Sequence, residues 1–200
     1  MPSAEFLDPS HFLVHAGWLI DGTGGPVRTG CIVEIKSGFI LSITPAPLTD
    51  RSPQNTKTDT QTIPLVDARN HLMLPGLMDS HVHLAWSATS GTQVRKYQFF
   101  APYREARERI IENLNDSIHY GIIAIRDGGD HYGHALKYKL EEARFSPFTL
   151  SIRACGKAVF RQGRYGGIIG EAVPVGDGIL NTVEKIPKHQ DHLKIVNSGL

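Results

Sequence analysis

The hydrophobic pattern of the chain changes at Pro75, and this change limits the folds that the sequence can adopt. Before Pro75, apolar and polar residues alternate in short runs, as in CIVEIK at residues 31–36. After it, short apolar runs alternate with longer segments of helical period. The first pattern is typical of an all-β subdomain, and the second is typical of strand–helix–strand units with a parallel sheet. We therefore expect a β-rich part over residues 1–74 and an α/β part over residues 75–200.

The β-rich part contains five short apolar runs that predict strands. They lie at residues 12–20, 31–36, 39–44, 63–68 and 71–74. Ser37 and Gly38 separate the second run from the third, and a two-residue loop of this kind predicts a β-hairpin. Arg69 and Asn70 mark a predicted turn between the last two runs. The polar, proline-containing segment 45–62 is expected to be a loop.

The α/β part predicts four strands with helices between them. The strands lie at 77–84, 122–127, 148–154 and 192–199; the helices lie at 104–120, 134–145 and 179–190, the last interrupted by Pro187. Ile110 and Leu114 belong to one apolar stripe of the first helix, and its polar face is expected to face solvent. Gly121 is expected to end this helix. The strand at 122–127 is apolar almost throughout, as in a sheet covered on both faces. Segment 161–178 is glycine-rich and predicts a loop.

Composition excludes several classes of function. The formal net charge is +1 and no nucleic-acid-binding motif occurs, so we expect no nucleic acid partner. No apolar run approaches the roughly 18 residues of a membrane span, and the N-terminus lacks the regions of a signal peptide. Cys31 and Cys155 form no CxxC motif and are expected to be reduced thiols. These features predict a cytoplasmic globular protein with no membrane partner.

The run LMLPGLMDSHVHL at residues 72–84 carries the most specific motif of the chain. His81 and His83 lie one residue apart at the end of a predicted strand, where alternate side chains share a face with Asp79. Their Cα atoms would be about 7 Å apart, so both imidazoles can converge on one metal ion. Asp79 could orient one of them. The alternative is a pair of core histidines bonded to backbone carbonyls.

Several segments resemble the amidohydrolase superfamily, including its prolidase-like and imidazolonepropionase-related branches. LPGLMDSHVHL is similar to the signature of the first barrel strand, GIIAIRDGG to the second strand and HLKIVNSG to the fourth. The preceding segment 17–43 resembles the small subdomain that comes before the barrel. The resemblance implies an α/β fold: a small N-terminal β-sandwich-type subdomain over 1–74, then the first half of a metal-dependent (β/α)8 TIM barrel, about four βα units, over 75–200.

Lys194, in the fourth predicted strand, is the second informative residue. A lysine in an apolar strand can simply extend to the barrel rim. The resemblance implies instead that Lys194 is carboxylated by CO2 and bridges two metal ions, with His81 and His83 as further metal ligands. Burial favours the neutral amine of a lysine, which is the form that reacts with CO2. The metal is expected to be a divalent ion, two zinc ions in the first place, with manganese, iron or nickel as alternatives.

The resemblance implies hydrolysis of a C–N bond in an amide or peptide-like small molecule, of the dipeptide or N-acyl amino acid type. Lys194 would be the catalytic lysine, and Tyr165 is a candidate substrate contact. The remaining ligands and the general base would come from later strands that these 200 residues do not include, so we expect the chain alone to be inactive. A mononuclear deaminase or cyclic-amidine hydrolase and a non-catalytic scaffold remain alternatives. A homo-oligomer is expected.

Four further residues are not expected to be ligands. Arg126 and Asp127, at the end of the second predicted barrel strand, are interpreted as a structural ion pair near the barrel mouth. His192 lies close to Lys194, and we interpret it, like His189, as a loop or strand-edge residue.

Overall fold

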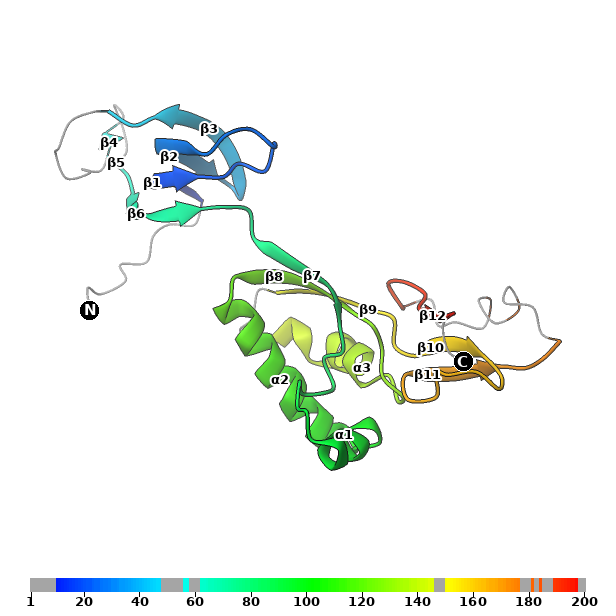
Figure 1. Ribbon diagram of the computed structural model, residues 1–200. Coiled ribbons are helices and arrows are strands. Elements are labelled where there is room, and N and C mark those ends of the chain that lie inside the picture. Colours follow the sequence, from blue (N-terminus) through cyan, green and yellow to red (C-terminus); the bar gives the residue numbers. More distant parts are fainter. Residues whose placement is uncertain are drawn as a thin grey trace. The chain divides into compact units, whose positions relative to one another are not determined.

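The computed structural model describes residues 10–47, 56–57, 62–145, 150–176, 181, 184 and 189–197. The chain has a mixed α/β architecture and divides into two compact units, Met1–Pro75 and Gly76–Leu200 (Figure 1). The sequence placed this boundary one residue earlier. None of the helices in the described ranges is long and apolar enough to cross a membrane.

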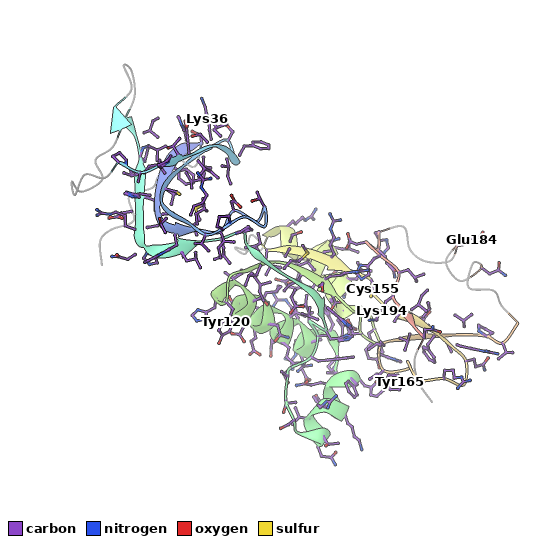
Figure 2. The ribbon with its side chains drawn as sticks, turned by 45° about the horizontal axis from the view of Figure 1, so that its top comes forward. Lys36, Tyr120, Cys155, Tyr165, Glu184 and Lys194 are labelled. Atoms are coloured by element: carbon purple, nitrogen blue, oxygen red, sulfur yellow. The ribbon has the colours of Figure 1, made fainter. Side chains whose placement is uncertain are left out.

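The first unit is built on a four-stranded sheet in the order β3-β2-β1-β6. Its strands are β1 (His11–Leu19), β2 (Arg28–Lys36), β3 (Phe39–Pro45) and β6 (Leu65–Met73). β2 is antiparallel to both of its neighbours, whereas β6 runs parallel to β1. Leu19 of β1 and Cys31 and Val33 of β2 form the buried cluster of this sheet. The sheet is curved (Figure 2). In the described residues, the only other sheet of this unit is the two-stranded pair β4 (Thr56–Lys57) and β5 (Thr62–Ile63).

The predicted hairpin between β2 and β3 is confirmed. Ser37 and Gly38 both have positive φ angles, 52° and 81°. Two positive φ values in a two-residue loop are the property of a type I′ turn, whose twist matches that of the flanking strands.

The turn predicted at Arg69–Asn70 is wrong, because β6 is one continuous strand. The register between β6 and β1 shifts here, between Ala16 and Trp18. A Cβ atom at Gly17 would lie 1.9 Å from the carbonyl oxygen of Arg69, so only glycine permits this close approach of the two strands. The polar residues therefore mark a bulge in a strand, not a turn between two strands.

The described residues of the second unit form two three-stranded sheets, each with parallel strands. The first has the order β7-β8-β9, from β7 (Leu77–Val82), β8 (Ile122–Asp127) and β9 (Ser151–Ala154). The second has the order β11-β10-β12, from β10 (Ala158–Arg161), β11 (Gly170–Val173) and β12 (Ile195–Val196). The helices are α1 (Thr92–Phe99), α2 (Tyr103–His119) and α3 (His134–Glu141), followed by the short 3-10 helix η1 (Ala143–Phe145).

Local chemistry explains where α2 and α3 lie. The apolar stripe of α2 is buried as predicted, through Ala106, Ile110 and Leu114. Gly121, with φ of 78°, follows the helix and confirms the predicted end. Asp130 precedes α3 and accepts hydrogen bonds from the backbone N–H groups of His134 (2.9 Å) and Ala135 (3.1 Å). A carboxylate at a helix N-terminus satisfies N–H groups that have no partner within the helix.

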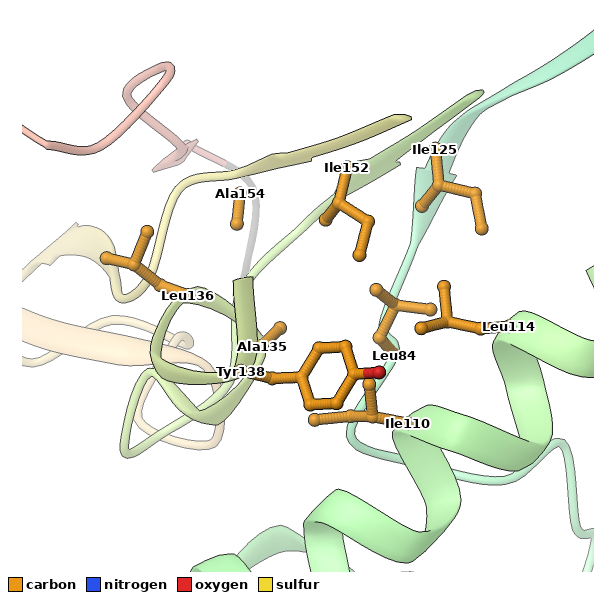
Figure 3. Packing of buried hydrophobic residues seen from close by; sticks show 9 residues of the cluster. All are labelled: Leu84, Ile110, Leu114, Ile125, Ala135, Leu136, Tyr138, Ile152 and Ala154. Atoms are coloured by element: carbon orange, nitrogen blue, oxygen red, sulfur yellow. The ribbon is translucent and has the colours of Figure 1, made fainter. Parts of the chain in front are cut away.

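The core of the second unit lies between the β7–β9 sheet and helices α2 and α3. Nine buried residues form it (Figure 3): Leu84, Ile110, Leu114, Ile125, Ala135, Leu136, Tyr138, Ile152 and Ala154. The expectation that β8 is covered on both faces is wrong for the described chain, since Ile123 is 57% exposed and Arg126 is also exposed. Ala124 lies on the opposite face of β8 from the core residue Ile125. Its partner on β7 is Met78, which is 70% exposed. In a closed barrel this second face lines the interior.

The sequence did not predict α1, β10 or β11. Segment 161–178, expected to be a loop, contains β11, and residues 177–178 lie outside the described part. Segment 192–199, expected to be a strand, is a strand only at β12, with 198–199 undescribed. β12 pairs with β10 and not with β9. Gly156, with φ of 71°, lies between β9 and β10, and such a residue interrupts a strand. Most of the helix predicted at 179–190 and residues 148–149 also lie outside the described residues.

Candidate metal centre

His81 and His83 lie at the carboxyl end of β7 with their rings together. The ring centroids are 5.4 Å apart. His81 is the next-to-last residue of the strand, and His83 directly follows its end. The carboxyl ends of parallel barrel strands are where the catalytic groups of TIM-barrel enzymes collect.

A backbone hydrogen bond fixes the ring of His83. Its Nδ1 lies 2.6 Å from the carbonyl oxygen of Gly129. A carbonyl only accepts, so Nδ1 carries the proton and Nε2 keeps a free lone pair. Burial lowers the pKa of His83 below its ordinary value, against the hydrogen bond to Gly129, and the nearby positive charge of Lys194 lowers it further. His83 is therefore held as the neutral imidazole that binds metals.

His81 is in hydrogen-bond contact with Lys194. The distance from Lys194 Nζ to His81 Nε2 is 3.1 Å. An ammonium group only donates, so His81 Nε2 accepts and its lone pair faces Lys194. These residues are separated by more than one hundred positions in sequence and come together only through the fold.

Gly128 leaves the space that both rings occupy. A Cβ atom at this position would lie 2.9 Å from His83 Cε1 and 3.0 Å from His81 Cδ2. Real Cβ contacts are longer, so any other residue would displace at least one imidazole. The two histidines can face each other only because this position has no side chain.

Side chains of α2 hold the segment that follows His83. Asn113 Nδ2 donates to the carbonyl oxygens of Leu84 and Trp86, both at 2.9 Å. Arg109 Nε donates to the carbonyl oxygen of Ala85 at 3.0 Å. The prediction that the polar face of this helix is only solvated is therefore wrong. No pattern in the sequence of α2 separates these two residues from its other polar residues.

The segment that carries Lys194 is anchored by Asp191. The Asp191 carboxylate accepts from Lys139 Nζ at 2.5 Å and from the backbone N–H of Ala154 at 2.8 Å. Lys194 itself is half-buried and precedes β12, and its carbonyl oxygen accepts the N–H of Val159 at 2.9 Å. The segment is thus hydrogen-bonded to β9 through Asp191 and to β10 through the carbonyl group of Lys194, although Lys194 itself does not lie within a strand.

The candidate ligands line a cavity of about 400 Å³. Trp86 stacks on His83 with centroids 4.6 Å apart, and Phe99 packs edge-on against Trp86. These rings form an aromatic wall. Arg95 of α1 and Tyr165, from the connection between β10 and β11, also line the cavity. The cavity is therefore lined by histidine nitrogens that can bind a metal, by aromatic rings and by the cationic side chains of Arg95 and Lys194.

The structure shows the contacts of three neighbouring residues. The β7–β8 register shifts between Asp79 and Val82. The Asp79 carboxylate accepts the backbone N–H of His81 at 3.0 Å. The ion pair between Arg126 and Asp127 is not formed: Arg126 is exposed, whereas Asp127 is buried and accepts backbone N–H groups. The two side chains follow each other along a strand and so point to opposite faces.

The other nearby histidines do not join the centre. His131 Nδ1 donates to the carbonyl oxygen of Gly167 at 2.7 Å, and His134 Nε2 donates to that of Ala101 at 3.1 Å. His192 lies in the loop before β12, and burial lowers its pKa. His189 lies in a turn.

The donor set fits a divalent metal in part. Two imidazoles, one of them fixed by a backbone carbonyl, are typical metal ligands. Within the described ranges, no group of three or more histidine, cysteine, aspartate or glutamate side chains is placed to hold an ion. A complete site therefore needs further ligands, and Lys194 qualifies only if its amine becomes an anion.

No protein-family model and no curated protein matches the sequence. Solved structures do match it. A Xaa-Pro dipeptidase with methionine in its active site has 22% identity and a TM-score of 0.67, over 95% of this chain and 48% of the other. An amidohydrolase matches at 18% identity and a TM-score of 0.67, over 95% and 47%. The ochratoxinase of A. niger matches at 15% identity and a TM-score of 0.66, over 96% and 47%. The chain thus spans about half the length of these structures and has the fold of the corresponding part of each, which supports at the level of fold the resemblance predicted from its motifs.

Proposed function

We propose that the protein containing this chain is a metal-dependent hydrolase of a C–N bond in an amide or peptide-like substrate, of the dipeptide or N-acyl amino acid type. The observation that carries the proposal is the convergence of His81, His83 and Lys194 on one cavity. The names of the matched structures, a Xaa-Pro dipeptidase and an amidohydrolase among them, support hydrolysis of this class of bond.

His81 and His83 would hold a divalent ion, with zinc as the first choice for imidazole ligands and manganese, iron or nickel as alternatives. The chemistry that such an ion supplies when bound is activation of water at neutral pH and polarisation of the scissile carbonyl. The contribution of the chain is to present the ligands in the correct form. Gly129 holds the proton on Nδ1 of His83, and Gly128 leaves both rings free to face the ion.

Lys194 would be carboxylated. A bond forms between the neutral Nζ and the carbon of CO2, an electron pair of one C=O bond moves to oxygen, and the nitrogen loses a proton to water. As an ammonium, Lys194 would repel a cation held by His81, whose Nε2 is 3.1 Å away. As a carbamate, it would attract the cation and offer two oxygen ligands. This reversal of charge would let one residue bridge two ions.

The cavity also supports the choice of substrate. Arg95 would attract the carboxylate of an amino acid leaving group, since guanidinium groups bind carboxylates through charge-assisted hydrogen bonds. Trp86 and Phe99 would contact an apolar part of the substrate. Tyr165, half-exposed at 55% on the same cavity, would be a further contact.

The test is metal content. The intact protein would be prepared with zinc and bicarbonate as wild type, Lys194→Ala and the control Lys157→Ala, which removes an exposed lysine paired with Glu171. About two zinc ions per chain are expected in the wild type and the control, and one or none in Lys194→Ala. Hydrolysis of dipeptides and N-acyl amino acids should fall with the metal content.

Two other results would contradict the proposal. A single metal that is unaffected by Lys194→Ala would indicate a mononuclear deaminase or cyclic-amidine hydrolase. An absence of metal in wild type and variants alike would indicate a non-catalytic scaffold.

A further inference from the structure

The buried carboxylate of Asp127 lies behind the candidate metal centre. Asp127 is the last residue of β8 and is 1% exposed. Its Oδ1 accepts the backbone N–H of Leu84 at 3.0 Å, and its Oδ2 accepts that of Gly129 at 2.9 Å. Across the described part of the chain, no lysine, arginine or histidine forms a salt bridge with it. Burying a carboxylate without a cationic partner is costly, so its two hydrogen bonds need an explanation.

Both hydrogen bonds of Asp127 lead to His83. Leu84 directly follows His83, so Oδ1 fixes the backbone beside this histidine. Gly129 provides the carbonyl oxygen that receives His83 Nδ1 at 2.6 Å, so Oδ2 fixes the group that orients the ring. Between them, the N–H of Gly128 donates to the carbonyl oxygen of Val82 at 2.6 Å. Segments 82–84 and 127–129 are thus hydrogen-bonded to each other on both sides of the His83 imidazole.

We infer that Asp127 is a positioning residue for His83: one carboxylate holds both the backbone of the histidine and the carbonyl that sets its tautomer. The inference rests on the proposed function, because it treats His83 as a metal ligand. Only a side chain with two acceptor oxygens can serve both N–H groups. An asparagine has the same shape but would turn an NH2 group toward one of them. Partners behind a metal ligand typically change metal affinity by about 10- to 100-fold.

Asp130 offers a matched control. It is also buried, at 2% exposed, and also accepts backbone N–H groups, but these belong to Tyr132, His134 and Ala135 at the start of α3. Asp130→Asn and Asp127→Asn therefore make the same chemical change three positions apart. Both should lower the melting temperature. Only Asp127→Asn should disturb the hydrogen bonds that hold the backbone on both sides of the His83 ring.

The experiment measures zinc affinity and the His83 ring in the intact protein. Zinc would be titrated against a competing chelator into wild type, both variants and His83→Ala. In parallel, ¹⁵N NMR of the metal-free protein would follow the Nδ1–H of His83, whose exchange with water is slowed by the bond to Gly129. We expect a roughly 10- to 100-fold weaker zinc affinity and fast exchange of this proton in Asp127→Asn, with neither change in Asp130→Asn.

Each other outcome has a defined meaning. Wild-type values in Asp127→Asn, or equal losses in both variants, would overturn the inference. If wild type and His83→Ala both fail to bind zinc, the proposed function is wrong, and the exchange rate of the Nδ1–H alone decides whether Asp127 positions the ring. If Asp127→Asn does not fold, replacing Leu84 by its α-hydroxy acid analogue removes only the N–H that donates to Oδ1. The same two readouts then apply.

Discussion

At the scale of single residues, the candidate centre depends on the absence of a side chain at position 128. Gly128→Ala should weaken zinc binding at least about 10-fold, because its Cβ would lie 2.9 Å from His83 and 3.0 Å from His81. Gly167→Ala is the control, since its Cβ would meet only Phe160, at 3.9 Å. Chelator competition and melting curves measure both effects. Equal zinc affinities in the two variants would show that the rings do not need this space.

Arg95 should determine the preference for anionic substrates. Arg95→Ala is expected to lower kcat/KM for substrates with a free carboxylate by about 10- to 100-fold, the worth of a hydrogen bond to a charged group. The same substrates capped as amides should lose little, because they offer no charge to the guanidinium. Steady-state kinetics on matched pairs of substrates provides the measurement. An equal loss for both members of a pair would remove Arg95 from substrate recognition.

The burial of Asp127 predicts a pH dependence of stability. Burial raises the pKa of its carboxyl group from 3.8 to about 7, against the hydrogen bonds from Leu84 and Gly129. The folded state therefore holds the proton more tightly than the unfolded state. The contribution of this bound proton to the free energy of unfolding is complete below pH 3.8 and is lost as the pH rises through about 7. The loss is about 1.4 kcal/mol per unit of pKa difference between the folded and unfolded states. Urea unfolding of wild type and Asp127→Asn across this range should show a smaller decline in the variant; parallel curves would contradict the assignment.

The sequence predicted the histidine pair, Lys194 and Tyr165 as site residues, because a short motif and an isolated lysine are visible in one dimension, and the structure places all four on one cavity. It did not identify Arg95, Trp86 or the role of Asp127. The helix that carries Arg95 buries only Gln98, so it has no apolar stripe to recognise. The partners of Asp127 are backbone N–H groups, which every residue except proline possesses.

At the scale of elements, features set by neighbouring residues were predictable and features set by a partner strand were not. The Ser37–Gly38 turn and the helix end at Gly121 each follow from local backbone preferences. The bulge in β6 depends on Gly17 in β1, more than fifty positions earlier. The pairing of β10 with β12 is likewise non-local, and these short strands lack the length that makes a hydrophobic period visible.

The loop before β12 should depend on Asp191. The carboxylate of Asp191 pairs with Lys139 and accepts the N–H of Ala154. Asp191→Asn removes the charge of this group and should lower the free energy of unfolding by about 1–3 kcal/mol. Glu171→Gln, which breaks the exposed pair with Lys157, should cost about 0–1 kcal/mol. Urea unfolding compares the two, and hydrogen exchange at Ala154 localises the effect. A loss in Asp191→Asn no larger than in the control would show that the loop is held by other contacts.

At the scale of the whole molecule, the second unit leaves apolar surface and an open edge on its first sheet. Leu77, Met78 and Ile123 are 50%, 70% and 57% exposed. β7 is an edge strand in the described residues, and an edge strand with apolar side chains promotes pairing with another chain. The matched amidohydrolase structures are about twice as long as this chain. We therefore expect this surface to be covered when the corresponding second half is present.

The 200-residue chain by itself should accordingly form dimers or larger assemblies. Light scattering coupled to gel filtration would measure the mass, and the double variant Met78→Ser/Ile123→Ser should shift it toward the monomer because it removes two of the exposed apolar side chains. Val94→Ser is the control: Val94 is 49% exposed but belongs to α1 and not to a strand of this sheet, so its loss should leave the mass unchanged. A stable monomer of the unmodified chain would show that the exposed strands do not drive association. Equal shifts in the control and the double variant would show that association depends on general surface hydrophobicity and not on this sheet.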